Sequence, residues 1–303
     1  MRLSNHKKAI LALILANFIW GAASPIFKWS LTNIHPFTLA FLRFFIPTLI
    51  LFPFAATQLK VKREHWLNLF LLAIFGITLN ISFYFMGLEK TDAINAPMIA
   101  TSGPIFLLIC CLLFLKEKIN RKIVSGTLIG FLGVLLIILQ PFLEKGHDGS
   151  IVGNLFLVIA TIAGVLHIVH AKKIMPYYSA TTVTFWAFLI GSLTFLPMLV
   201  FESQRVGFLP NLSLPGIVGI VFGAIFSSLI GYFVYHWSIK TLFAQEVGIF
   251  AYIDPIIAVI IAIPLLGEIP TPIYVLGSIF VFAGIFIAEG RLPYHPLHKW
   301  REH

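Results

Sequence analysis

Long apolar runs separated by short polar stretches make up most of this chain. A helix needs about 20 apolar residues to cross about 30 Å of hydrocarbon. Runs of this length predict ten membrane helices, at residues 9–29, 36–57, 66–88, 93–115, 122–141, 151–171, 180–201, 214–239, 245–266 and 271–289. Since the connections are short, consecutive helices should be antiparallel neighbours in one bundle.

Composition supports this interpretation. Of the 303 residues, 59% are hydrophobic and 11% are charged, whereas about a quarter of the residues in a soluble domain are charged. No polar block is long enough to form a soluble domain. The apolar run near the N-terminus is too long for the core of a signal peptide, so we assign it as the first membrane helix. The sequence therefore predicts an all-α integral membrane protein.

The basic residues fall mainly on one side of the predicted helices. With the N-terminus in the cytoplasm, 16 Lys and Arg residues lie inside, 4 lie outside and Arg43 lies within a span. Cytoplasmic loops carry such an excess of Lys and Arg. The sequence therefore predicts a multi-pass protein of the cytoplasmic (plasma) membrane with both termini in the cytoplasm. The net charge of +9 is explained by the basic residues of the cytoplasmic loops, so nucleic acid is not an expected partner.

The chain also matches itself at an offset of 151 residues. Between residues 84 and 139 this offset gives twelve identities without a gap. The matched pairs include residues that break, end or closely pack helices: Tyr84 with Tyr235, Pro104 with Pro255, Glu117 with Glu268, Gly126 with Gly277, and Gly133 with Gly284. The match therefore indicates a shared geometry, because apolar character alone would not select these residue types.

An offset of this size divides the chain into two five-helix repeats, residues 1–145 and 146–303. Because five is odd, the second repeat should be inverted relative to the first. Inverted repeats recur in secondary transporters, where two similar halves expose one central site to either side of the membrane. A duplication kept only for packing is the alternative.

Three motifs carry a resemblance to a known family. They are Trp20-Gly21 in FIWGAASP, Arg43 in LAFLRFF, and the pattern Pro-x(12)-Glu-x(8)-Gly-x(6)-Gly, which occurs in both halves. With these motifs the chain resembles the EamA family of the drug/metabolite transporter superfamily. The resemblance implies a ten-helix exporter or importer of small organic metabolites, often amino acids or amines, without ATP-binding parts. Consistently, the sequence contains no GxxxxGK[ST] loop.

Two ionisable residues lie within predicted spans, Arg43 and Asp254. An ionisable group inside a membrane helix is costly and is a functional-site hypothesis by default. In one interpretation both flank a midplane cavity, where Arg43 holds a substrate carboxylate and Asp254 holds a substrate amine or a coupling proton. In the other, they pair with each other, or with backbone freed at Pro255, and hold the bundle together.

Further candidates surround these two. Pro104 and Pro255 should break their helices at the same depth, which leaves Thr101 and Ser102 as the polar side chains nearest the first break. Trp20 suits a cavity wall, whereas Tyr84, Tyr235 and Tyr252 suit packing or an interface as well as a site. His167 and His170 are expected at the membrane interface, and no role is assigned to His236. Glu117 and Glu268 are expected to anchor loops. Four glycines should allow close helix packing: Gly126, Gly133, Gly277 and Gly284.

Two rival functions remain to be weighed. An intramembrane serine hydrolase would need Ser102 within hydrogen-bond reach of His236, yet the two residues lie at different predicted depths. A passive channel would differ from a transporter by a flux that does not saturate. The sequence thus predicts a transporter, with a small molecule and the lipid bilayer as its partners. It contains no metal or cofactor motif, no enzymatic activity is expected, and a monomer is compatible with it.

Overall fold

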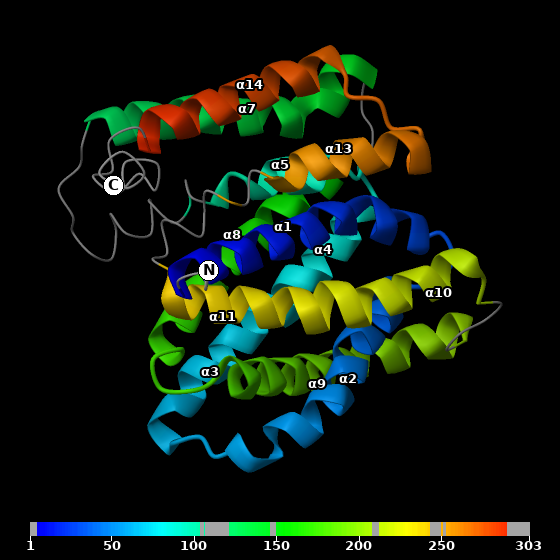
Figure 1. The fold of residues 1–303 in the computed structure, drawn as a ribbon. Coiled ribbons are helices and arrows are strands. Elements are labelled where there is room, and N and C mark those ends of the chain that lie inside the picture. Colours follow the sequence, from blue (N-terminus) through cyan, green and yellow to red (C-terminus); the bar gives the residue numbers. More distant parts are fainter. Residues whose placement is uncertain are drawn as a thin grey trace.

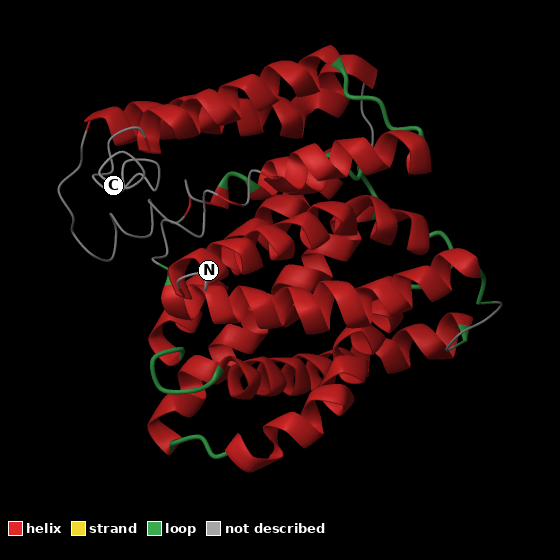
Figure 2. Cartoon of the chain, viewed as in Figure 1, coloured by secondary structure: helices red, strands yellow, loops and turns green. Residues whose placement is uncertain are grey.

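The computed structural model describes residues 5–103, 106, 121–145, 150–207, 212–242, 250 and 253–289. This part of the chain is helical and contains no strand (Figure 2). Its first half consists of α1 (Asn5–Ser30), α2 (Pro36–Ala55), η1 (Ala56–Gln58), η2 (Arg63–His65), α3 (Trp66–Ala73), η3 (Ile74–Leu79), α4 (Asn80–Leu88), α5 (Asn95–Ala100) and α7 (Arg121–Lys145). Its second half consists of α8 (Ser150–Ile174), α9 (Ala180–Val206), α10 (Leu214–Val221), η4 (Phe222–Tyr232), α11 (Phe233–Thr241), α13 (Ile253–Leu266) and α14 (Pro272–Glu289).

Six helical stretches in the described residues are long and apolar enough to cross a membrane. They are Asn5–Ser30, Pro36–Gln58, Arg63–Leu88, Ile151–Ile174, Ala180–Arg205 and Leu214–Ser238, and each coincides with a predicted span. Shorter apolar helices cover Leu128–Gln140, Ile253–Leu266 and Pro272–Gly284. The predicted spans at 93–115 and 245–266 lie partly outside the described residues. The chain is therefore a multi-pass helical membrane protein.

Large apolar side chains lie on the outside of the bundle as well as in its core. Leu49, Phe54, Leu193 and Phe286 are each more than half exposed. A soluble protein rarely exposes so much apolar surface, whereas hydrocarbon is a favourable environment for it. The outer surface thus fits a lipid-facing role.

Helices far apart in the sequence pack side by side (Figure 1). α7 and α14 form a pair along one edge, and α5 and α13 lie next to it. α1 contacts α13 on one side and the continuous helix α10–η4–α11 on the other. α2 packs against α9, and α4 packs against α8. The centre of the bundle therefore receives side chains from both halves of the chain.

Glycines allow α7 and α14 to approach closely. A Cβ atom at Gly133 would come within 2.5 Å of the Gly277 carbonyl oxygen. A Cβ at Gly284 would come within 2.5 Å of the Gly126 carbonyl oxygen. A Cβ at Gly277 would lie 2.8 Å from Ile137 and 3.0 Å from the Gly133 carbonyl oxygen. Side chains therefore do not fit at Gly133, Gly277 or Gly284, and Gly126 packs against Gly284, which confirms the predicted close packing of the four glycines. Because residue numbers rise along one helix as they fall along the other, the pair is antiparallel.

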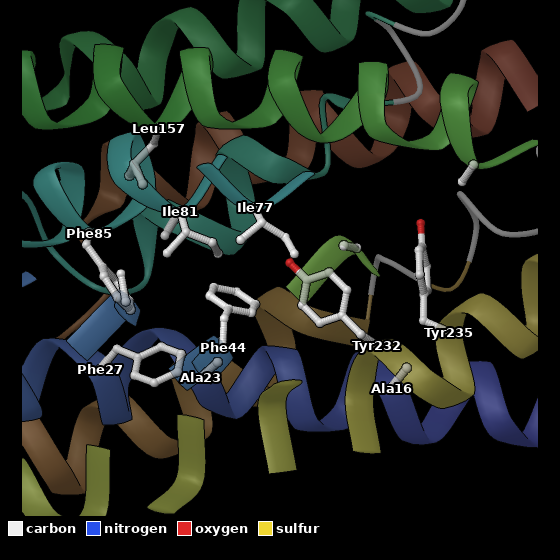
Figure 3. Packing of buried hydrophobic residues seen from close by; sticks show 14 of the residues in the cluster. Ala16, Ala23, Phe27, Phe44, Ile77, Ile81, Phe85, Leu157, Tyr232 and Tyr235 are labelled. Atoms are coloured by element: carbon white, nitrogen blue, oxygen red, sulfur yellow. The ribbon is translucent and has the colours of Figure 1, made fainter. Parts of the chain in front are cut away.

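The core inside the bundle is rich in aromatic rings. Phe27, Phe44 and Phe85 are fully buried, and together with Tyr232 they gather near the middle of the bundle (Figure 3). The Phe27 and Phe85 rings meet edge to face, with their centroids 5.2 Å apart. Such contacts add to the burial of apolar area. Of these rings, Phe27 and Tyr232 also line a cavity inside the bundle.

Candidate functional site

A cavity of about 250 Å³ lies inside the bundle. Its size is close to the lower end of the range for small-molecule pockets, about 300–1,000 Å³. α1, α2, α4, α5, α8, α11, α13, η3 and η4 all contribute to its wall. The polar and aromatic lining residues include Trp20, Arg43, Asn80, Tyr84, His167, Ser227, Tyr232, Tyr235 and Asp254. The fold therefore surrounds a small space with a few polar groups from both halves.

Arg43 extends from α2 into this space and is only 3% exposed. Its Nε atom donates to the hydroxyl of Ser228 at 3.0 Å, and its Nη2 atom donates to the hydroxyl of Ser227 at 2.9 Å. The guanidinium carbon lies 4.7 Å from the centre of the Phe27 ring and 5.1 Å from that of Phe44. Aromatic faces stabilise a cation in this geometry.

The contacts of Arg43 leave part of its donor capacity unused. Its Nη1 atom is buried and has no hydrogen-bond partner in the part of the chain that the structure describes. The two serine hydroxyls are neutral, so they satisfy hydrogen bonds without balancing the positive charge. A buried, unbalanced guanidinium is suited to bind an anionic group.

Asp254 lies in the first turn of α13 and lines the same cavity. Its buried Oδ1 atom has no hydrogen-bond partner among the described residues. Arg43 and Asp254 thus share one cavity, and the direct ion pair that one of the two interpretations allowed is not formed between them. The two groups of opposite charge type remain available to a third molecule.

Trp20-Gly21 places α1 against this part of α13. A Cβ at Gly21 would lie 2.8 Å from the carbonyl oxygen of Asp254 and 2.9 Å from its Cα atom. Only a glycine lets the two backbones come this close. The neighbouring Trp20 indole donates to the Ser227 carbonyl oxygen at 3.0 Å. Both residues of the motif therefore position the cavity wall, as expected for Trp20.

The Trp20 ring packs against two tyrosines that also line the cavity. Its centroid lies 5.3 Å from that of Tyr232 and 4.8 Å from that of Tyr235. The Tyr232 hydroxyl donates to the Gly76 carbonyl oxygen at 3.2 Å, and Figure 3 shows this hydroxyl directed toward the segment that carries Ile77. Tyr232, which the sequence favoured as a packing or interface residue, thus also lines the cavity.

Two π-helical segments meet at this tyrosine. η3 contains Gly76, and η4 contains Ser227, Ser228 and Tyr232. Most of η4 corresponds to η3 at the offset of 151 residues, since Ile74–Leu79 maps onto residues 225–230. π-helical turns occur frequently at functional sites. The wider turns present the serines to Arg43 and the Ser227 carbonyl to Trp20.

The structure brings together five of the predicted site residues: Asp254, Arg43, Trp20, Tyr84 and Tyr235 all line the cavity. Two others do not line it. The Thr101 hydroxyl donates to the Met98 carbonyl oxygen, and the Ser102 hydroxyl donates to that of Ile99. α5 ends at Ala100, and Thr101 and Ser102 form the turn that follows.

Four further predictions concern residues at helix breaks or helix ends. Pro104 and Tyr252 lie outside the described residues, as does Glu117. Pro255 is buried in the first turn of α13, where its missing N–H costs no helical hydrogen bond. Gly103, the counterpart of Asp254 in the first repeat, also lines the cavity.

The predicted interfacial place of His167 is wrong. His167 and His236 are 4% and 0% exposed, and their Nε2 atoms lie 3.3 Å apart. The packing of α8 against η3 buries His167, because Gly76 leaves room for its ring. Both histidines lie within predicted spans, so the rule that selected Arg43 and Asp254 could also have selected them. His170 contacts Asn68, its Nδ1 atom lying 3.1 Å from Oδ1.

Those contacts also bear on the predicted hydrolase alternative. The His236 ring is hydrogen-bonded to His167 and to the Thr184 hydroxyl, and the Ser102 hydroxyl donates to the Ile99 carbonyl oxygen. The Ser102–His236 pair that this chemistry needs is therefore not formed. Within the described residues, no group of three His, Cys, Asp or Glu side chains is arranged to hold a metal ion.

Glu268 joins three elements of the bundle. Its carboxylate accepts hydrogen bonds from the Ala93 N–H at 2.9 Å and the Ile94 N–H at 3.2 Å. Lys28 Nζ lies 3.7 Å from Glu268 Oε1 and also donates to the Thr91 carbonyl oxygen. The predicted anchoring by Glu268 is confirmed, although the anchored N–H groups are remote in the sequence. α1, the start of α5 and the end of α13 are tied together here.

The apolar helices, the internal cavity and its polar groups define a multi-pass membrane protein with a small-molecule-sized interior site. The model of the EamA-like transporter family matches residues 7–139 and again residues 151–289. The chain belongs to this family, within the drug/metabolite transporter superfamily.

Several relatives are described as transporters. An uncharacterized transporter of Archaeoglobus fulgidus is 30% identical over 284 residues, which cover 93% of this chain and 98% of the relative. Another from that organism is 26% identical over 291 residues, with 94% and 99% covered. The uncharacterized transporter YyaM of Bacillus subtilis is 26% identical over 301 residues, with 95% and 96% covered.

A solved structure shares the fold. It is 16% identical in sequence and superposes with a TM-score of 0.66 over 98% of this chain and 99% of its own length. At this identity the similarity concerns the fold alone. The family and the relatives together support a membrane transporter.

Proposed function

We propose that this chain is a secondary transporter of small metabolites that carry both a carboxylate and an amino group, such as amino acids. One observation carries the proposal: Arg43 and Asp254 line one small cavity without pairing, and each has a buried polar atom without a partner in the described structure. An uncompensated charge in this environment is costly. A zwitterionic substrate compensates both groups at once.

The assigned roles follow from the chemistry of the two groups. Arg43 binds the substrate carboxylate, because a guanidinium recognises a carboxylate with two parallel N–H donors. Asp254 accepts hydrogen bonds from the substrate ammonium group. Trp20, Tyr84 and Tyr235 surround the apolar part of the substrate. The small volume limits the substrate to a small side chain.

Alternating access by two inverted five-helix halves, residues 1–145 and 146–303, is the proposed mechanism. The family model matches each half separately, and η3 and η4 occur at corresponding positions. At the offset of 151 residues Gly133 corresponds to Gly284, and Gly126 corresponds to Gly277. The Gly133–Gly277 contact therefore corresponds to the Gly284–Gly126 contact. A two-fold axis in the membrane plane relates such contacts, as in other transporters with inverted repeats.

The location belongs to the same proposal. We place the protein in the cytoplasmic membrane with both termini in the cytoplasm, because the asymmetry of Lys and Arg residues favours this orientation. In that orientation Lys28 and Glu268 lie near the outer face, so the Glu268 contacts hold α1, α5 and α13 together on that side.

Uptake into liposomes tests the proposed function. The purified protein is reconstituted and supplied with three compounds of one carbon skeleton: the amino acid, its deaminated acid and its decarboxylated amine. We expect saturable uptake of the amino acid and weaker uptake of the other two. Flux that rises linearly with concentration would indicate a channel, and equal uptake of all three compounds would contradict the assigned roles of Arg43 and Asp254.

A further inference from the structure

A pair of buried histidines lies next to the cavity and has no part in the substrate contacts described above. His167 on α8 lines the cavity, and His236 on α11 lies behind it. Their rings are nearly parallel, with an interplanar angle of 30° and centroids 5.4 Å apart. We propose that His167 and His236 together form a proton-binding site that takes up one proton and shares its charge through the hydrogen bond between their Nε2 atoms.

The hydrogen bonds determine where the hydrogens lie in the neutral pair. His167 Nδ1 is 3.1 Å from the Leu72 carbonyl oxygen, which can only accept, so Nδ1 carries the hydrogen. The Nε2 atom of a neutral His167 is then an acceptor, and His236 Nε2 must donate to it across 3.3 Å. His236 Nδ1 consequently accepts from the Thr184 hydroxyl at 2.7 Å. Each of the four ring nitrogens then has a hydrogen-bond partner. The donors all point the same way, from Thr184 through His236 and His167 to the Leu72 carbonyl oxygen.

The same arrangement can accept one proton without moving a ring. The added proton binds the lone pair of His236 Nδ1 and replaces the hydrogen bond that this atom accepts from Thr184, and no covalent bond is broken. The Thr184 hydroxyl, which is both donor and acceptor, rotates so that its oxygen accepts from the new N–H. The positive charge is shared through the Nε2–H···Nε2 hydrogen bond. Thr184 therefore acts as the element that permits both states.

The surroundings contain other groups that titrate or carry charge. Tyr232 faces both rings, at centroid distances of 6.3 Å from His167 and 5.9 Å from His236. Tyr235 lies 6.3 Å from His236. On α8, His170 follows one turn after His167. From α3 and α9, the Leu72 carbonyl and the Thr184 hydroxyl face the rings, and from α1 the Trp20 indole packs on both tyrosines.

Arg43 and Asp254 line the same cavity as His167. No carboxylate among the described residues forms an ion pair with either histidine. A proton on the pair therefore adds a positive charge that a carboxylate in the cavity would stabilise. Linkage then requires that such a ligand and the proton favour each other's binding. This coupling rests on the proposed function, whereas the proton-binding site itself does not.

Nuclear magnetic resonance of the purified protein, labelled with ¹⁵N-histidine, tests the site without any substrate. His167→Gln and His236→Gln assign the two signals among the ten histidines. At neutral pH we expect the hydrogen on Nδ1 of His167 and on Nε2 of His236. On acidification from about pH 8 to about pH 4, both signals should change at one shared midpoint. Thr184→Val should lower this midpoint by about one pH unit, about tenfold weaker proton binding, and Thr184→Ser should restore it.

Two results would overturn the site. In one, both rings keep their neutral tautomers throughout the range in which the protein stays folded. In the other, each histidine titrates independently, so that His236→Gln leaves the midpoint of His167 unchanged. Liposome uptake then separates this inference from the proposed function: saturable uptake that depends on pH in the wild type but not in His236→Gln supports coupling. Absence of uptake would refute the transporter proposal and leave the resonance result to decide the proton site.

Discussion

Gly21 lies directly against the backbone of Asp254. An added Cβ at Gly21 would come within 2.8 Å of the Asp254 carbonyl oxygen and within 2.8 Å of Ile257 Cβ. The close contact joins the Trp20-Gly21 motif of α1 to the start of α13. The Trp20-Gly21 motif and Asp254, both recognised from the sequence, thus lie at the same helix–helix contact.

Gly21→Ala should therefore disturb the site and the fold together. Relieving a clash against backbone atoms requires α1 and α13 to separate, and overpacking of this kind costs about 1–3 kcal/mol. We expect a lower melting temperature in detergent. Gly103→Ala is the matched control for stability, because its Cβ would lie 3.7 Å from Val165 and 3.9 Å from Thr161, which are ordinary contacts. Equal melting temperatures for the two variants would contradict the close contact.

Arg43→Lys tests whether the shape of the guanidinium matters as well as its charge. A lysine ammonium cannot donate to both Ser227 and Ser228 while presenting a planar fork to a carboxylate. Losing one charge-assisted hydrogen bond costs about 1.5–3 kcal/mol, so the apparent affinity for substrate should fall by about tenfold to about a hundredfold. Saturation curves of liposome uptake measure this change. An unchanged KM in Arg43→Lys would remove Arg43 from the binding site.

Glu268 should make stability depend on pH. Burial raises the pKa of its carboxyl above the ordinary value of 4.5, and the N–H of Ala93 and the charge of Lys28 offset only part of this effect. The folded protein therefore holds the proton more tightly than the unfolded chain does. The contribution of Glu268 to the free energy of unfolding must fall as pH rises from the ordinary value through the raised one.

Thermal unfolding of the wild type and Glu268→Gln across this pH window checks the sign. The melting temperature of the wild type should decrease relative to that of Glu268→Gln as the pH rises from about 4.5, because glutamine does not ionise. A difference that stays constant with pH, or that changes in the opposite sense, would show that Glu268 is not desolvated by its contacts with α1 and the start of α5.

The glycine contacts between α7 and α14 make a prediction about assembly of the bundle. Gly133→Ala places a methyl group against the Gly277 carbonyl oxygen and the Val281 N–H, so the two helices must separate. Since small residues let membrane helices approach closely, we expect reduced thermal stability and increased proteolysis near the α7–α14 pair. Retention of wild-type stability would mean that this pair contributes little to the fold.

Much of the fold could be predicted because hydrophobic length is a local property. Each of the six long apolar helices coincides with a predicted span. Arg43 and Asp254 were recognisable because an ionisable group in hydrocarbon needs a special reason. Their relationship was not predictable, because it depends on how α2 and α13 pack. The offset of 151 residues aligned Gly103 with Asp254, and both line the cavity.

Other features depend on contacts that sequence patterns do not encode. The pairing of His167 with His236 spans 69 residues and joins helices that are not consecutive. It also has no counterpart in the first half, where the corresponding positions are Ala16 and Phe85. The π-helical turns of η3 and η4 give no periodic signal that differs clearly from that of an α-helix. Tyr232 was therefore indistinguishable from an ordinary packing tyrosine.

The most direct test of the central claim is the uptake of a small amino acid by Asp254→Asn in liposomes, compared with the wild type at equal amounts of inserted protein. Asparagine has nearly the same shape but no charge, so it cannot balance a substrate ammonium group. The proposed function predicts saturable uptake by the wild type and loss of most of this uptake in Asp254→Asn, with folding and insertion unchanged. Wild-type uptake by Asp254→Asn, with only a change in melting temperature, would contradict it and assign Asp254 to the fold.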